Sequence, residues 1–184
     1  MTYKMIPAGY MYKHIAQKPD WLKTQTVKNI YSVSGCVSDD FADYINYWKH
    51  NGYWLFNSPK VMKEIATIEQ FSIEKCTLFY YEVYEFEYYE DEKSWSAFSP
   101  ETSFVTEIIS PTIKELCGYD VVNFYAKSSP ECSLLSCNSI ADNVEVNSHC
   151  LFRTFEEAKY HLEAETFKDC EPGPYRIFAV YKIS

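Results

Sequence analysis

Apolar residues recur at helical spacing in four segments of the chain. Ser38 stands before the first of these segments and can cap its amino terminus. Ser58 precedes Pro59, and proline suits the first helical position because its nitrogen carries no hydrogen. Thr154 and Glu157 have the spacing of a capping box. We therefore expect helices, or a short helical turn in the third case, over 38–51, 58–68, 110–118 and 154–162.

Alternating apolar and polar residues predict strands between these helices. The last strand, 175–183, carries apolar residues on both faces, which is typical of a strand covered on two sides. The long strand 77–89 changes its inward parity near Val83 and Tyr84, and this change predicts a β-bulge. Shorter strands are expected at 10–16, 27–33, 53–56, 104–109 and 119–126.

Helices and strands do not alternate strictly, and this order favours an α+β fold. We expect an antiparallel or mixed twisted sheet of about six or seven strands, with three or four helices packed on it. Neither a repeat nor a linker divides the 184 residues. Residues 1–184 are therefore expected to form a single globular domain.

The charge balance limits the classes of partner. Seventeen Lys and Arg stand against 26 Asp and Glu, which gives a net charge of −9. Only Arg153 and Arg176 could read phosphates or guanine edges in bidentate fashion, so nucleic-acid binding is disfavoured and a basic protein is the expected partner. No apolar run is long enough to span a membrane. Seven cysteines, an odd number, fit thiols in a reducing compartment, and we expect a cytoplasmic protein.

The spacing of the five glycines excludes two nucleotide-binding motifs. No two glycines lie closer than 17 positions apart, whereas a P-loop or a dinucleotide-binding turn needs them within about six residues. The chain also lacks the G-x-S-x-G and H-E-x-x-H motifs. We expect no cofactor, and no catalytic residue is assigned.

Six acidic residues and no basic residue occupy positions 82–92. One interpretation is a solvated hairpin tip, in which charge protects an exposed strand edge. The other is a docking surface for a basic protein, with aromatic anchors among the carboxylates; aromatic residues make up 18% of the chain. The binding residues expected on this hypothesis are Glu82, Glu85, Glu87, Glu90, Tyr88, Tyr89 and Trp95.

The segment 127–147 has weak periodicity and is either a functional loop or an unrecognised structural element. An alternative site falls in and just after it, comprising Cys132, Cys137, His149 and Cys150. These residues could bind zinc or pair a nucleophilic thiol with an imidazole. The adjacent His149 and Cys150 would have difficulty directing both side chains at one ion, and buried structural thiols are the usual alternative. We therefore assign no metal.

Three stretches carry a resemblance to other proteins: 33–54, 130–139 and 171–177, the last reading E-P-G-P-Y-R-I. They resemble a family of small uncharacterised bacterial proteins found in mobile gene cassettes and beside toxin genes. The resemblance implies an immunity-type role by analogy. The function expected is a non-enzymatic acidic binding protein, of the immunity or antitoxin kind, that engages a basic partner. The alternative is a thiol- or metal-dependent enzyme using the Cys132–Cys150 region.

Overall fold

The computed structural model describes residues 3–40, 50–98, 107–125 and 131–184. Within these ranges the chain forms nine strands, three α-helices and one 3-10 helix. The strands are β1 (Met5–His14), β2 (Ala16–Gln17), β3 (Asn29–Ile30), β4 (Asp39–Asp40), β5 (Thr77–Tyr84), β6 (Phe86–Tyr89), β7 (Ser94–Ala97), β8 (Glu115–Asn123) and β9 (Tyr175–Lys182). The helices are α1 (Pro59–Glu69), α2 (Leu134–Cys137), η3 (Ile140–Asp142) and α3 (Phe155–Glu163).

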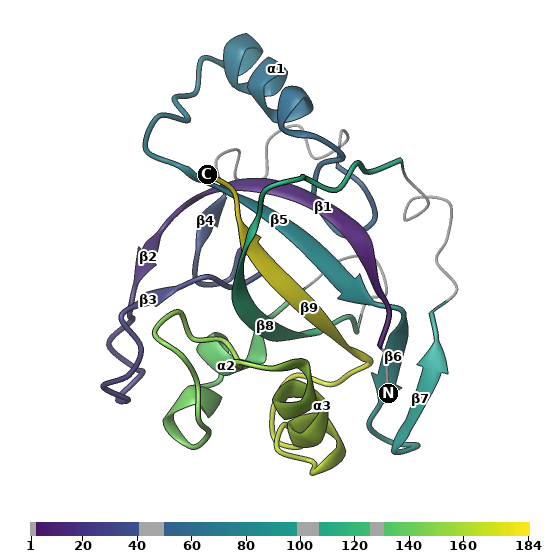
Figure 1. The fold of residues 1–184 in the computed structure, drawn as a ribbon. Coiled ribbons are helices and arrows are strands. Elements are labelled where there is room, and N and C mark those ends of the chain that lie inside the picture. The colour runs from purple at the N-terminus through teal and green to yellow at the C-terminus, as the bar shows by residue number, and fades with distance from the viewer. Residues whose placement is uncertain (1–2, 41–49, 99–106, 126–130) are drawn as a thin grey trace.

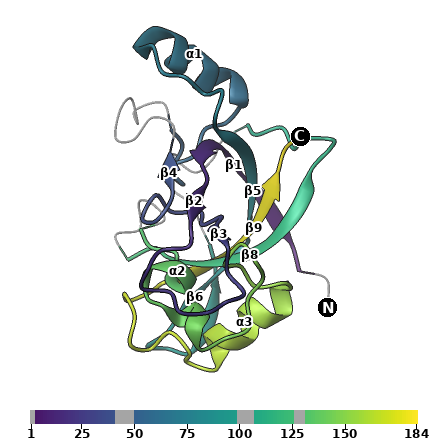
Figure 2. The ribbon, with the colours of Figure 1, turned by 90° about the vertical axis from the view of Figure 1, so that its left-hand side faces the viewer.

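Seven of these strands form one sheet in the order β4-β1-β5-β9-β6-β7, with β8 also paired to β9. Every one of these pairings is antiparallel, and β2 and β3 form a separate two-stranded sheet. Figures 1 and 2 show α1 at the opposite end of the sheet from α2 and α3. The expected α+β class, with an antiparallel sheet and helices packed on it, is confirmed.

Strand β9 lies at the centre of the sheet and is covered on both faces, as its sequence predicts. Phe178 and Val180 belong to an apolar cluster that also receives the buried side of α1. Ile177 and Ala179 belong to a second cluster, which receives the buried side of α3. Because successive side chains of a strand point to opposite faces, one strand connects the two cores.

The long strand predicted over 77–89 is interrupted near the expected position. Glu85 separates β5 from β6, and its backbone N–H donates to the Lys4 carbonyl. A second irregularity occurs in β8, where the register shifts between Leu116 and Gly118. Gly118 has a φ of 145°, and a Cβ there would lie 2.6 Å from the Phe152 carbonyl oxygen. This position requires glycine because no side chain fits beside that carbonyl.

Two of the helix predictions are confirmed. Helix α1 begins at Pro59, and α3 begins after Thr154, whose side chain accepts from the Glu157 N–H in a capping box. The segment 127–147 contains α2 and η3, so part of it is an element that periodicity did not reveal. An α-helix of four residues and a 3-10 helix of three are too short to produce a periodic pattern.

Other expectations from periodicity were wrong in part or lie outside the described residues. No helix forms over 110–118; instead β8 begins at Glu115, because pairing with β9 overrides the local helix signal. Asp39 and Asp40 form β4 beside β1, and the rest of the helix predicted over 38–51 lies largely outside the described residues. Residues 53–56 contribute one isolated bridge, from Phe56 to Tyr10, and the strand predicted over 27–33 shortens to β3.

The strand predicted over 104–109 lies partly outside the described residues, and no strand forms over 107–109. Among the described helices, none combines the length and apolar character that crossing a membrane requires.

Candidate metal centre

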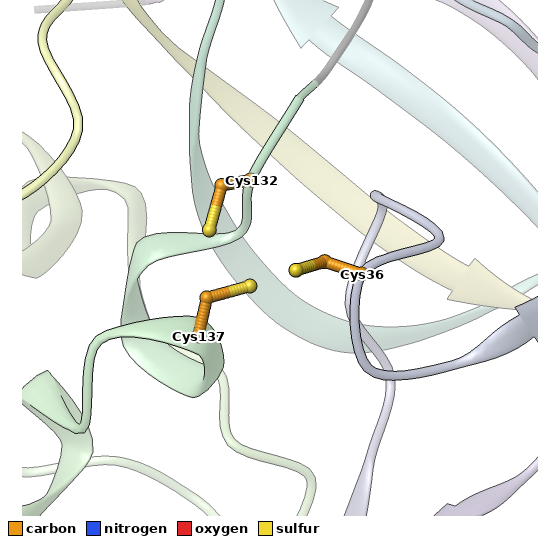
Figure 3. A group of neighbouring side chains, drawn as sticks. All are labelled: Cys36, Cys132 and Cys137. Atoms are coloured by element: carbon orange, nitrogen blue, oxygen red, sulfur yellow. The ribbon is translucent and has the colours of Figure 1, made fainter.

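Three cysteine sulfurs converge at one place in the fold. The Sγ atoms of Cys36, Cys132 and Cys137 all lie within 4.8 Å of one another. Figure 3 shows Cys36 approaching from one loop and the other two from the α2 segment. Cys132 is buried, Cys137 is half-buried and Cys36 is exposed. The cluster therefore lies at the boundary between the core and solvent.

The two segments that carry the cluster are far apart in sequence. Cys36 lies in the connection between β3 and β4, whereas Cys132 precedes α2 and Cys137 is its last residue. The single turn of α2 brings the second pair together, because the Cys137 N–H donates to the Ser133 carbonyl at 3.0 Å. Four residues separate Cys132 from Cys137, and the helical turn brings their side chains closer together than an extended chain would.

A reciprocal pair of hydrogen bonds joins these segments. The Ser34 N–H donates to the Ser133 hydroxyl at 3.2 Å, and the Ser133 N–H donates to the Ser34 hydroxyl at 3.1 Å. Both serines are buried. Since each serine lies within two positions of a cluster cysteine, this pairing fixes the separation of the cysteine-bearing backbones.

A buried carboxylate reinforces the same junction from β8. One oxygen of Asp120 accepts from the Ser133 hydroxyl at 2.6 Å and from the Val33 N–H at 2.9 Å. Burial raises the pKa of Asp120 to about 6, although both hydrogen bonds oppose the rise. The carboxylate therefore connects the β8 core to both cysteine-bearing segments.

Lys13 contacts the backbone of the loop that carries Cys36. Its ammonium nitrogen lies 3.0–3.1 Å from the backbone carbonyl oxygens of Ser32, Val33 and Ser34 and from the Ser38 hydroxyl, so its three N–H groups are shared among these acceptors. It also pairs with the Asp40 carboxylate at 3.1 Å, and the Lys13 side chain is only 2% exposed. A buried charge with this many acceptors holds the loop in one conformation.

Proximity changes the acid–base behaviour of the three thiols. Hydrogen bonds from Cys132 and Cys137 lower the pKa of Cys36, because they stabilise its thiolate. The pKa of Cys132 is raised by its hydrogen bonds to Cys137 and Cys36. The thiolate form is the one that binds metals, so the cluster already favours its first charged ligand.

The alternative site predicted from sequence is only partly assembled. Cys132 and Cys137 do come together, but Cys36 joins them instead of His149 and Cys150. The His149 ring stacks on Tyr31 with centroids 4.0 Å apart, and its Nδ1 lies 2.6 Å from the Asn29 side-chain oxygen. Cys150 is buried, and burial raises the pKa of its thiol. Both residues serve the local packing.

The carboxylates predicted to form a docking surface each contact a different part of the chain. Glu82 accepts from the Tyr181 hydroxyl and pairs with Lys114, whereas Glu85 pairs with Lys4 at 3.6 Å. Glu87 and Glu90 accept from tyrosine hydroxyls, those of Tyr89 and Tyr175 respectively. These acids are contiguous in sequence but do not converge on one point.

The predicted aromatic anchors are also engaged within the molecule. Tyr88 is 2% exposed and belongs to the core cluster that contains α3. The Trp95 indole N–H donates to Glu163 at 2.8 Å, and the Lys159 ammonium lies over its ring. Tyr89 is half-buried beside Glu87.

A second thiol–imidazole contact lies elsewhere in the structure. The Cys76 Sγ is 3.6 Å from the His14 Nε2 at the ends of β5 and β1. Burial raises the pKa of Cys76, so this contact does not favour a thiolate.

Sequence reasoning did not identify Cys36 as a partner of Cys132 and Cys137. The local sequence Val33-Ser34-Gly35-Cys36 contains no ligand spacing, since the nearest cluster partner is 96 positions away. Comparison with protein families, curated proteins and solved structures finds no match to this chain. The candidate site therefore depends on the geometry of this structure.

Proposed function

We propose that the protein binds one thiophilic metal ion of the zinc class through Cys36, Cys132 and Cys137. The observation that supports the proposal is the convergence of three sulfurs within 4.8 Å. Thiolates prefer soft or borderline cations such as Zn²⁺ and Cu⁺ to the hard cations that carboxylates bind. This proposal departs from the sequence-based expectation of no metal.

The sulfur spacing suits such an ion with little rearrangement. Zinc–sulfur bonds of about 2.3 Å in a tetrahedral arrangement place neighbouring sulfurs about 3.8 Å apart. The spacing in the structure has an upper bound of 4.8 Å, so contraction by about 1 Å or less brings the sulfurs to that distance. Rotation of the exposed Cys36 side chain can bring its sulfur closer to the other two.

The second support is the buried scaffold behind the ligands. Lys13, Asp120 and the Ser34–Ser133 pair hold the two segments together through side chains that are at most 2% exposed. A site whose ligands are already positioned loses less conformational entropy when the ion binds. The scaffold thus favours a metal-binding role over a chance approach of three thiols.

The experiment is a competition titration of the reduced protein with Zn²⁺ and a chromogenic chelator. Wild type should bind one ion, and Cys36→Ser, Cys132→Ser and Cys137→Ser should each weaken binding at least tenfold, because each removes a thiolate ligand. Cys170→Ser is the matched control, since Cys170 is half-buried and lies outside the cluster. Equal affinity in all five proteins would contradict the proposal.

A second candidate function is the acidic docking of a basic protein, of the immunity or antitoxin kind. Its support is the exposed charge at the turn between β6 and β7, where Asp91 and Glu92 are both exposed. Charge at such a position raises association rates with an oppositely charged partner. Reversal of Asp91 and Glu92 to Lys should slow association with a basic partner at low salt, and an unchanged rate would remove this surface from consideration.

A further inference from the structure

The chain provides three soft ligands to the cluster. All seven cysteines and all four histidines lie within the described residues, so each has a known position. Among the described side chains, no other cysteine, histidine or acid joins Cys36, Cys132 and Cys137. A tetrahedral zinc site needs four donors. The described cysteines, histidines and acids therefore supply three of the four donors, and the fourth position can be filled by solvent or by an added ligand.

The exposure of the cysteines shows which side of the cluster is open to solvent. Cys132 is 5% exposed and lies against the protein interior, whereas Cys36 is exposed. Asp120 and the paired serines occupy the space behind the cysteine-bearing segments. Solvent therefore reaches the cluster from the side of Cys36. Zinc sites with three protein ligands and one solvent-accessible position are the kind that exchange ligands.

The charge of the assembly favours a neutral fourth donor. Three thiolates and one divalent cation sum to a single negative charge, and an anionic fourth ligand would double it. The protein as a whole carries a net charge of −9, which adds to the cost of bringing an anion to the site. Water or a neutral nitrogen base avoids both costs.

We propose that the bound ion keeps an exchangeable fourth position on the Cys36 side, which holds water and takes up neutral imidazole-type ligands in preference to anions. This inference depends on the proposed metal-binding function and specifies its ligand class. In this arrangement the three thiolates stay bound to the ion, and the ion binds a small nitrogen donor at its fourth position.

The test uses the full-length reduced protein loaded with Co²⁺, whose visible spectrum reports the ligands around the ion. Titration with imidazole should shift the ligand-field bands saturably, while the sulfur-to-cobalt charge-transfer intensity stays constant. Acetate should require at least a tenfold higher concentration for a comparable shift. Cys170→Ser should reproduce both titrations, because its thiol is outside the cluster.

The outcomes separate this inference from the proposed function. Absence of the charge-transfer band before any imidazole is added would contradict metal binding by the cluster. A normal charge-transfer band with no response to imidazole would overturn the exchangeable position alone. Acetate binding as tightly as imidazole would overturn the preference for neutral ligands.

Discussion

The acidic segment 82–92 and the cysteine cluster differ in how distance along the chain relates to distance in space. The acids of 82–92 are neighbours in the chain, yet their carboxylates contact Lys4, Lys114 and tyrosines in separate places. Cys36 lies 96 positions from Cys132, yet their sulfurs are within 4.8 Å. Along a strand, neighbouring side chains diverge to opposite faces, whereas tertiary hydrogen bonds can join distant loops.

The two regions also differ in how they are supported. The acidic segment 82–92 carries ion pairs between half-buried and exposed groups, such as Lys4 with Glu85. The cluster is held by Lys13, Asp120 and paired serines, all of which are buried. Because buried polar groups are costly to leave unpaired, substitutions near the cluster should cost much more stability than matched substitutions around the acidic segment.

The largest expected effect is that of Lys13→Met. This change keeps most of the side-chain volume but leaves Asp40 and several loop acceptors without the ammonium group. Removing one partner of a buried ion pair costs about 3–5 kcal/mol of unfolding free energy, measured by urea denaturation. The matched control is Lys4→Met, for which a loss below about 1 kcal/mol is expected because its pair is exposed. Equal losses of unfolding free energy in Lys13→Met and Lys4→Met would contradict the expected difference between the two regions.

The next effect concerns the pH dependence of stability through Asp120. Its pKa is raised to about 6 by burial, so the unfolded chain ionises this carboxyl at lower pH than the folded protein does. The folded state then binds more protons between about pH 4 and 6, and the unfolding free energy falls as the pH rises through this window. The fall should be on the order of 3 kcal/mol in wild type.

Asp120→Asn keeps an oxygen acceptor and removes the titration, so its stability should lack this fall. Asp120→Ala should be destabilised at every pH, because the Val33 N–H and the Ser133 hydroxyl lose their acceptor. Denaturation curves at several pH values measure both effects. The same slope in wild type and Asp120→Asn would show that another group titrates.

A smaller effect is expected for Ser133→Ala. It removes the hydroxyl that accepts from Ser34 and donates to Asp120, and the loss should be about 1–2 kcal/mol with weaker Zn²⁺ binding. Ser94→Ala, in the β6–β7 hairpin, removes only an exposed bond to Glu92 and should change stability by less than about 0.5 kcal/mol. If Ser133→Ala bound Zn²⁺ as tightly as wild type, the serine pair would have no role in positioning the cysteines.

The smallest effect is expected in the hairpin itself. Reversal of Asp91 and Glu92 to Lys should leave the melting temperature and Zn²⁺ affinity of the reduced protein within error of wild type, because both side chains are exposed. A large loss of either property would show that the hairpin supports the cluster.

The elements that could be predicted from sequence are those with strong local signals. The capping box of α3, the proline start of α1 and the two-sided β9 were all predicted correctly. The helix predicted over 110–118 was not, since pairing of β8 with β9 overrode a local helix start. Cys36 was missed for a similar reason: its role depends on hydrogen bonds between Ser34 and Ser133, 99 positions apart, which leave no local pattern.

The most direct test of the central claim is zinc K-edge X-ray absorption on the metal-loaded protein. If Cys36, Cys132 and Cys137 form one site, the spectrum should show three sulfur atoms at about 2.3 Å from the zinc and one lighter neighbour. Cys36→Ser should reduce the sulfur count to two, whereas Cys170→Ser should leave it at three. A spectrum without sulfur neighbours, or one that Cys36→Ser does not change, would contradict the account.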